Sequence, residues 1–294
     1  MESVGQGVGD RVAQVGSDLV AADPYFDIQS SAFGGLSKTT LNFWRDTLAT
    51  KVVQSPYAPS PAAPGRRYDH LFFSGMTLLI LLTVFFGFAQ SYYLAGVFQA
   101  PLPNRLVHIH GAVFTCWILL LITQTLLVSV HRVDIHRRLG LVGFGLVCIM
   151  PVVAILAAID SMVRHASRPN ALSFFAVPTF DILAFLPLIF FAWKYRSNAA
   201  THKHLILLAT IAILDAAVVR WPIHASWWGL HPAEWMTDAF LLPLFAYDLF
   251  SIRKIHPATL WGSLLFLVLQ HVRGAIGHSD AWLTLAAWIQ HTAR

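Results

Sequence analysis

Seven apolar stretches, each close to the thickness of a lipid bilayer, occupy most of the sequence between residues 72 and 272. A hydrocarbon core about 30 Å thick is crossed by about 20 helical residues. The stretches cover residues 72–97, 106–130, 139–163, 174–194, 204–223, 235–252 and 257–273. None alternates polar and apolar residues over ten positions, as a membrane-spanning strand does. The sequence therefore predicts an all-α, polytopic membrane helix bundle with about seven transmembrane helices.

The composition excludes an ordinary soluble globular domain. Hydrophobic residues make up 56% of the 294 residues, charged residues only 12%, and the mean hydropathy is +0.60. These values indicate lipid as the solvent of the chain. The net charge of +5 does not indicate nucleic acid, because the basic residues lie mainly in short loops beside the apolar stretches.

The distribution of those basic residues predicts the orientation of the chain, because cytoplasmic loops are enriched in Lys and Arg. One side has Arg66, Arg67, Arg132, Arg137, Arg138, Lys194, Arg196, Lys203, Arg253 and Lys254. The other side has Arg105, Arg164, Arg168, Arg220 and Arg273. We therefore expect a cytoplasmic N-terminus, a periplasmic C-terminus and a location in the bacterial inner membrane. Trp282 and Trp288 predict an interfacial helix over residues 280–291.

The sequence predicts two domains, a cytoplasmic N-terminal arm of residues 1–65 and a membrane domain of residues 66–294. The arm ends in a segment with four prolines, SPYAPSPAAPG, which favours an extended linker. Within the arm, residues 40–53 place Trp44, Leu48 and Val52 on one helical face. This pattern is typical of a helix on a membrane or partner, and equally of a marginal helix in a disordered tail.

Charges inside the apolar stretches are few, and each costs at least about 2.5 kcal/mol in hydrocarbon unless it has a partner, a cavity or a cofactor. At 1.5 Å per residue, Asp181 and Asp215 lie at about the same depth, roughly 12–13 Å from the outer surface. The same estimate places six more residues in or near the outer third, namely His108, His110, Arg220, His224, Asp238 and His271. The inner half contributes mainly Gln124. We therefore expect a polar His/Asp/Arg chamber that opens outward.

The histidines of the second stretch differ in direction. His110, Trp117 and Gln124 recur every seven residues and share one helical face. His108 and His110 diverge by about 200° on an ideal helix, so only one of them is expected as a ligand.

Three interpretations of the chamber are open. In a redox protein, His108 or His110 and His271 would ligate haem b or a transition metal. Asp181, Asp215 and Asp238 would then orient the imidazoles or complete a metal site with His110 and His271. A second haem near the inner face would need His136 with His202 or His204.

In the second interpretation, a proton-coupled transporter, Asp181 and Asp215 share a proton or bind a cation, because two buried carboxylates cannot both ionise cheaply. In the third, an accessory or structural subunit of a larger membrane complex, Arg220 neutralises an aspartate and nothing reacts. Most inner histidines are then solvated surface groups, namely His131, His136, His202, His204 and His256.

Two segments are candidate partner surfaces, the N-terminal arm and residues 220–235. The second, RWPIHASWWGLHPAEW, is apolar and interrupted by Pro222 and Pro232, so that it could cover the chamber or bind a partner through Trp227 and Trp228. The chain has no Gly-rich phosphate loop, HExxH or GxSxG motif, which excludes the standard hydrolase mechanisms and leaves the question of an enzymatic activity open.

Residues 106–150 contain an outer histidine (His108 or His110), a mid-helix Gln124 and a His-Arg-x-x-Gly motif formed by His136, Arg137 and Gly140. This segment resembles a broad group of uncharacterised multi-pass bacterial membrane proteins. The group is similar in layout to membrane cytochromes that carry haem b, which implies haem as a cofactor. Residues 194–222 match less well, because they lack the glycine, which places an inner haem site in doubt.

Overall fold

The structure is a computed structural model that describes residues 69–101, 103–221 and 232–294. The chain divides into two units, Met1–Ala63 and Pro64–Arg294, and the described residues all belong to the second unit. The N-terminal arm of residues 1–65, with the helix expected over residues 40–53, lies outside the described residues. So do His224, Trp227 and Trp228 of the outer segment.

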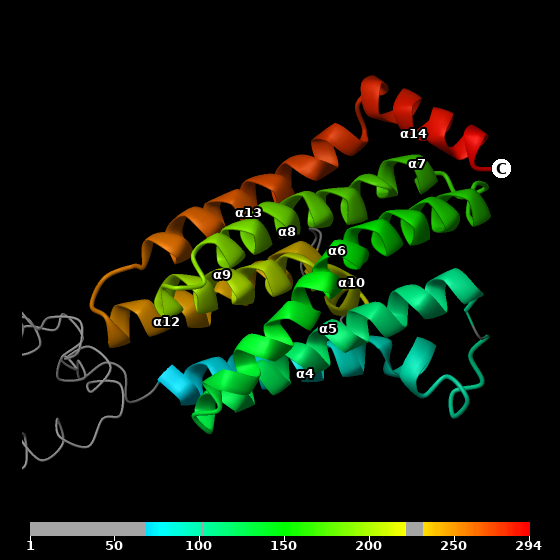
Figure 1. The fold of residues 1–294 in the computed structure, drawn as a ribbon. Coiled ribbons are helices and arrows are strands. Elements are labelled where there is room, and N and C mark those ends of the chain that lie inside the picture. Colours follow the sequence, from blue (N-terminus) through cyan, green and yellow to red (C-terminus); the bar gives the residue numbers. More distant parts are fainter. Residues whose placement is uncertain (1–68, 102, 222–231) are drawn as a thin grey trace, which may run out of the picture. The chain divides into compact units, whose positions relative to one another are not determined.

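The described residues are all-helical and contain no strand. The helices are α4 (Asp69–Phe88), which continues into a π-helical turn, η2 (Ala89–Tyr93), then α5 (Arg105–Ser129), α6 (Val133–Arg164), α7 (Ala171–Phe174), α8 (Ala176–Lys194), α9 (Ala199–Ala212), α10 (Asp215–Val218), α11 (Pro232–Ala239), α12 (Leu241–Ser251), α13 (Pro257–Gly277) and α14 (Asp280–Thr292). We call the end of the bundle where α4, α6, α9 and α13 begin the near end, and the opposite end the far end (Figure 1).

Five helical segments are long and apolar enough to cross a membrane: Asp69–Tyr93, Arg105–Ser129, Val133–Arg164, Ala171–Lys194 and Pro257–Gly277. The apolar stretches predicted over residues 204–223 and 235–252 are helical but interrupted. The multi-pass membrane character is thus supported with five candidate spans, and a count of seven stays a prediction.

Each interruption is visible in the backbone hydrogen bonds. Between α9 and α10 the helical pattern of backbone hydrogen bonds changes to short turns, in which the Leu214 N–H donates to the Ile211 carbonyl at 3.0 Å. Between α11 and α12, Pro243 has no N–H to donate to the carbonyl of Ala239, four residues earlier. The chain bends at Phe240, whose N–H donates to the Thr237 carbonyl at 3.1 Å. Backbone breaks of this kind occur at membrane depth only where protein or a cavity surrounds them.

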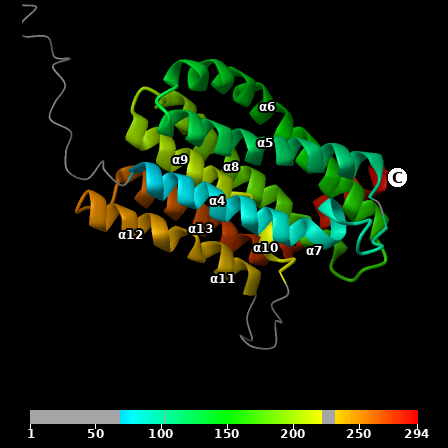
Figure 2. The same ribbon diagram turned by 90° about the horizontal axis from the view of Figure 1, so that it is seen from below.

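The core lies where α8, α9 and α13 pack together, with α4 and α5 against them. Phe185, Leu208, Ile211 and Phe266 are at most 1% exposed. Trp117 of α5 donates its Nε1–H to Thr210 of α9 at 3.2 Å. Helices α5 and α6 lie on the opposite side of the bundle from α11 and α12 (Figure 2). Each of these helices therefore buries one face against the core and leaves another outward.

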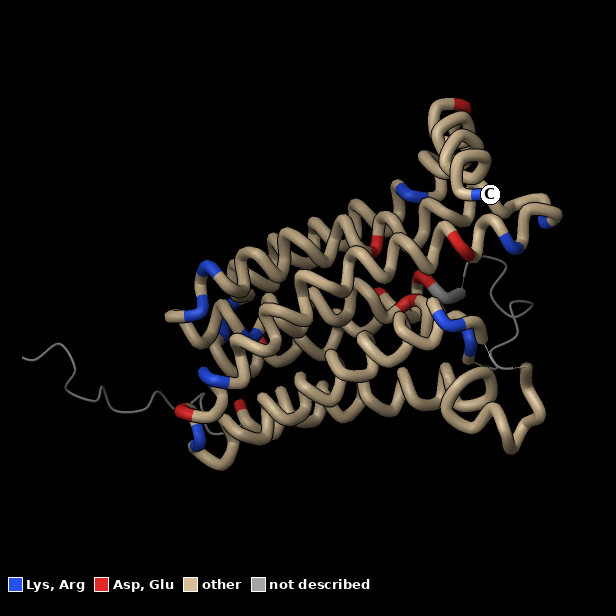
Figure 3. The backbone as a smooth tube through the Cα atoms, turned by 45° about the vertical axis from the view of Figure 1, so that its right-hand side comes forward, with Lys and Arg blue, Asp and Glu red and all other residues tan. Residues whose placement is uncertain are grey.

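The outward faces are apolar. Leu71, Leu141, Phe250 and Trp261 are between 66% and 84% exposed. An apolar exterior of this extent is unfavourable in water and favourable in lipid. Lys and Arg lie mainly toward the two ends of the bundle, which leaves a band with few of them in between (Figure 3). These features indicate a multi-pass membrane protein.

The predicted helix at residues 280–291 is present as α14. Ser279 caps it by accepting a hydrogen bond from the Trp282 N–H. The indole of Trp282 donates to the Leu172 carbonyl of α7 at 3.2 Å, and Gln290 donates to the Met162 carbonyl of α6 at 3.0 Å. The helix is thus fixed to the far end of the bundle, and its position at a membrane interface stays a prediction.

Candidate functional site

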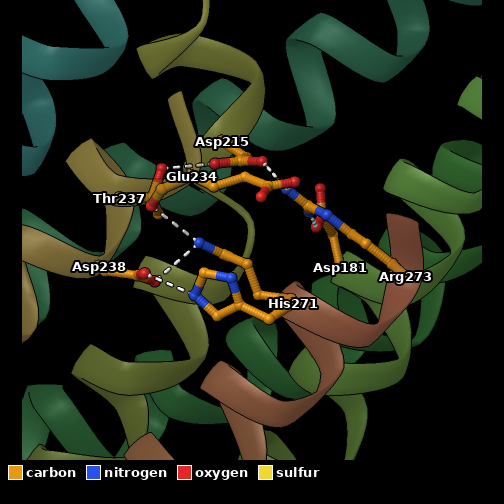
Figure 4. A network of polar contacts seen from close by, with 8 residues as sticks. Asp181, Asp215, Glu234, Thr237, Asp238, His271 and Arg273 are labelled. Carbon is orange, nitrogen blue, oxygen red and sulfur yellow. Dashed lines mark hydrogen bonds and ion pairs between the residues drawn. The ribbon is translucent and has the colours of Figure 1, made fainter. Parts of the chain in front are cut away.

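The most strongly charged part of the interior is centred on Arg273, which is 1% exposed near the end of α13. Its Nη1 lies 2.6 Å from Oδ1 of Asp181 in α8. Its Nη2 forms a hydrogen-bonded ion pair with Oδ2 of Asp215, the first residue of α10. The same Nη2 lies 3.3 Å from Oε1 of Glu234 in α11. One guanidinium therefore connects three carboxylates from three separate helices (Figure 4).

A second group of polar contacts continues from this one. The Asp215 carboxylate accepts a hydrogen bond of 2.5 Å from the hydroxyl of Thr237. Asp238, one residue further along α11, accepts from Gln270 at 2.8 Å and lies 2.8 Å from Nε2 of His271. Gln270 also donates to the Glu234 carbonyl at 3.0 Å. We call the whole set the far-end cluster; it consists of Asp181, Asp215, Glu234, Thr237, Asp238, Gln270, His271 and Arg273.

Helix geometry explains how the chain assembles this cluster. Gln270 and Arg273 are three residues apart on α13 and share one face, which both bury. Asp215 stands at the break between α9 and α10, where the chain turns and places the carboxylate against α13. Glu234, Thr237 and Asp238 follow at spacings of three and four on α11, so that they present polar groups to the same region.

The charges of the far-end cluster do not balance if every group around Arg273 is ionised, because three carboxylates face one guanidinium. The side chains of Asp181 and Asp215 are only 13% and 7% exposed, so water screens them little. Two unneutralised negative charges are unfavourable there, and a bound proton or cation relieves the imbalance. This site can therefore take up positive charge.

Two buried polar atoms beside the acids have no hydrogen-bond partner among the described residues. They are Nε of Arg273 and Oε1 of Gln270, whose residues are 1% and 3% exposed. Buried polar atoms are nearly always paired in native proteins, often with ordered water.

The structure brings together four of the predicted site residues, Asp181, Asp215, Asp238 and His271. Asp181 and Asp215, which the depth estimate placed level with each other, contact the same guanidinium. The sequence interpretation missed Arg273, Glu234, Thr237 and Gln270. Arg273 had been counted among the outer loop residues, although its position three residues after Gln270 on an apolar helix was the signal for a buried role.

The remaining outer residues have other neighbours. The ring of His110 lies 4.3 Å from that of Phe114, and the ring of His108 lies 5.6 Å from that of Tyr92. Arg220 donates to the Ala216 carbonyl and lies over the ring of Phe88 at 4.6 Å. The expectation that Arg220 neutralises an aspartate is wrong, because the guanidinium of Arg273 occupies that role.

Gln124 joins α5 to the start of α6. Its Nε2 donates to the His136 carbonyl at 3.2 Å. The ring of His136 lies 6.4 Å from that of His202, which is tied by Nδ1 to the Ala192 carbonyl at 2.9 Å. His136 and His202 are thus neighbours, as an inner ligand pair requires. His204 faces elsewhere and is 2% exposed, so the expectation of a solvated surface histidine is wrong at this position.

The near end is also more polar than expected. Lys203, Asp69 and Tyr247 form one set of contacts there, with Lys203 Nζ 2.5 Å from Oδ2 of Asp69. His204 and Asp248 form another, at 2.9 Å between Nε2 and Oδ1. The expectation that the inner half contributes mainly Gln124 is therefore wrong. Asp69 precedes the stretch over residues 72–97, Asp248 lies near the end of the stretch over residues 235–252, and the depth estimate considered neither of them.

Within residues 69–101, 103–221 and 232–294, no group of three or more His, Cys, Asp or Glu side chains has an arrangement that could hold a metal ion. Comparison with known proteins adds no further assignment: no protein-family model matches the chain, and neither a curated protein nor a solved structure matches it.

Proposed function

We propose that this protein is a proton-coupled membrane transporter whose coupling site is the far-end cluster. The observation that supports this best is the excess of carboxylates around Arg273 in a buried position. Ionisable residues inside membrane bundles are costly and mark ion pathways and proton relays. Uptake of one proton or one cation changes the balance of attraction between α8, α10, α11 and α13. Coupling needs such a link between binding and the packing of helices.

The broken helices support the same proposal. In several transporter folds, binding sites lie where transmembrane helices are discontinuous, because the ends of the helix segments supply polar groups. Asp215 stands at the break between α9 and α10, and Glu234, Thr237 and Asp238 lie on α11 just before its break with α12. We propose that these two interrupted segments also cross the membrane, which gives seven crossings. The near end is then cytoplasmic, the far end periplasmic, and the membrane is the bacterial inner membrane.

The experiment that tests this proposal measures proton movement in proteoliposomes with a pH-sensitive dye trapped inside. A panel of cations, sugars, amino acids and organic anions is added in turn under an imposed pH gradient. We expect at least one solute to move protons through the native protein. Asp215→Asn should reduce that coupled flux by at least about tenfold, because the amide cannot exchange the proton.

Asp160→Asn is the matched control. Asp160 is an acid at the end of α6 that pairs with Arg164 outside the far-end cluster. Its variant should retain the native flux. If no solute moves protons, or if Asp215→Asn transports like the native protein, the transport proposal is wrong.

The redox interpretation stays a separate prediction. It places haem b or a transition metal on His108 or His110 with His271, and an inner haem on His136 with His202. The purified protein would then show a haem absorbance band or a stoichiometric metal, which His110→Ala or His271→Ala removes. A colourless and metal-free preparation made from haem-replete, metal-replete cells would contradict this prediction.

A further inference from the structure

The near end holds a second buried pair that the transport proposal does not use. His204 of α9 is 2% exposed, and Asp248 of α12 is fully buried. Nε2 of His204 lies 2.9 Å from Oδ1 of Asp248. On the other side of the ring, Nδ1 of His204 lies 2.6 Å from the carbonyl oxygen of Ala200. Both ring nitrogens therefore face oxygen atoms.

The number of protons follows from these contacts. A carbonyl oxygen only accepts, so Nδ1 of His204 must carry a proton to donate to Ala200. The other oxygen of Asp248, Oδ2, accepts from the peptide N–H of His256 at 2.8 Å. The contact between Nε2 and Oδ1 then needs a proton of its own, on either the imidazole or the carboxyl group. Without it, the lone pair of Nε2 would face a carboxylate oxygen.

We infer that His204 and Asp248 form a proton-binding site at the near end that holds one proton between them. The pair is then either an imidazolium with a carboxylate or an imidazole with a carboxylic acid. Both forms are neutral overall, which is the state that a buried position favours. This inference stands whether or not the far-end cluster transports protons.

Other titratable groups surround the pair. The set comprises Asp69 from α4, Lys203 from α9, Tyr247 from α12, and Lys254 and His256 from the connection to α13. Lys203, Asp69 and Tyr247 satisfy one another, because Lys203 pairs with Asp69 and the Tyr247 hydroxyl donates to the same carboxylate. The charges of Asp69 and Lys203 thus offset each other. Neither group takes part in the proton that His204 and Asp248 share.

The ring of His256 lies directly against the pair. Its ring stacks on that of His204, with centroids 4.6 Å apart and an angle of 11° between the planes. Nδ1 of His256 accepts from the Ala258 N–H at 3.1 Å, so this nitrogen carries no proton. Partial burial lowers the pKa of His256. A neutral, half-buried imidazole thus lies beside the pair.

The near-end pair and the far-end cluster both take residues from the same two interrupted segments, α9 with α10 and α11 with α12. His204 and Asp215 lie on either side of the break between α9 and α10. Asp248 lies beyond the break that separates α12 from Glu234, Thr237 and Asp238. Release of the proton from the near-end pair would leave a buried negative charge and weaken the contact between α9 and α12.

The test uses the full chain in lipid nanodiscs, labelled with ¹⁵N histidine and ¹³C aspartate. At pH 7 we expect the His204 ring, assigned by its loss in His204→Gln, to carry protons on both nitrogens. If the carboxylic form is present instead, infrared spectra should show a carboxylic acid band that Asp248→Asn removes. In Asp248→Asn the amide N–H donates to Nε2, so the ring should become neutral with its proton on Nδ1.

A neutral His204 together with an ionised Asp248 in the native protein would overturn the inference. So would an imidazolium that persists in Asp248→Asn. If the variants fail to fold, nitrogen-to-carbon dipolar couplings in the native protein identify the pair directly. His271→Gln removes the coupling of a second histidine–aspartate pair among the described residues, His271 with Asp238. The signals of His204 should survive in Asp215→Asn, which separates this inference from the transport proposal.

Discussion

Replacing Arg273 with glutamine is expected to destabilise the folded bundle by about 3–5 kcal/mol, which is the usual cost of removing one member of a buried ion pair. The guanidinium is the only cation that contacts Asp181, Asp215 and Glu234 among the described residues. Without it, these carboxylates repel one another in a region that water hardly reaches. The free energy of unfolding in mixed micelles, measured by titration with a denaturing detergent, gives the size of the effect.

Arg164→Gln is the matched control for that measurement. Arg164 pairs with Asp160 at 2.7 Å, but its side chain is 45% exposed. An exposed ion pair contributes about 0–1 kcal/mol, so this variant should unfold almost like the native protein. In the Arg273→Gln background, adding Asp215→Asn should restore part of the lost stability, because it removes one of the unpaired charges. Equal stability of Arg273→Gln and Arg164→Gln would contradict a structural role for the buried cation.

The sequence predicts the membrane helices well because lipid imposes a simple rule: long apolar stretches must be helical. The stretches that gave α4, α5, α6, α8 and α13 are uninterrupted and appear as candidate spans. The stretches over residues 204–223 and 235–252 are as apolar, but they break in the structure. Hydropathy is averaged over a whole stretch of residues. It carries no information on where the backbone hydrogen bonds of a helix are interrupted. Pro243 lies beside the second break, but a proline alone does not specify a break, because α6 and α8 contain Pro151 and Pro187 without one.

The candidate site was predictable only in part, for a related reason. Depth along an isolated helix placed Asp181 and Asp215 at one level, and both contact Arg273. Arg273 was counted with the basic residues of the outer side when the orientation was predicted, because it lies at the edge of its apolar stretch. Which cation faces a buried acid depends on the rotation and packing of helices. A single sequence without a partner motif does not specify these.

The histidines illustrate the same limit. Residues 202 and 204 are two apart on α9 and therefore point to nearly opposite sides. His202 faces His136 and the Ala192 carbonyl, whereas His204 faces Asp248. The sequence interpretation treated them as interchangeable partners for His136, and the contact of His204 with Asp248 of α12 is what distinguishes them.

Replacing Gly87 with alanine is expected to destabilise the protein by about 1–3 kcal/mol, the usual range for an overpacked contact. Gly87 lies near the end of α4, where α10 crosses it. A Cβ at this position would overlap the carbonyl oxygen of Ala217 and lie 2.9 Å from its carbonyl carbon. These are backbone atoms that cannot move aside as a side chain can. Unfolding in mixed micelles measures the loss.

Gly75→Ala is the matched control on the same helix, because a Cβ there meets nothing within 4 Å. Alanine is favoured over glycine in a helix, so this variant should be as stable as the native protein or gain up to about 1 kcal/mol. Ala217 lies two residues after Asp215, and a displaced α10 moves the Asp215 carboxylate away from Arg273. Gly87→Ala should therefore also lose the solute-coupled proton flux, while Gly75→Ala keeps it. Native flux in a destabilised Gly87→Ala protein would show that the contact between α4 and α10 supports the fold but does not position the acid.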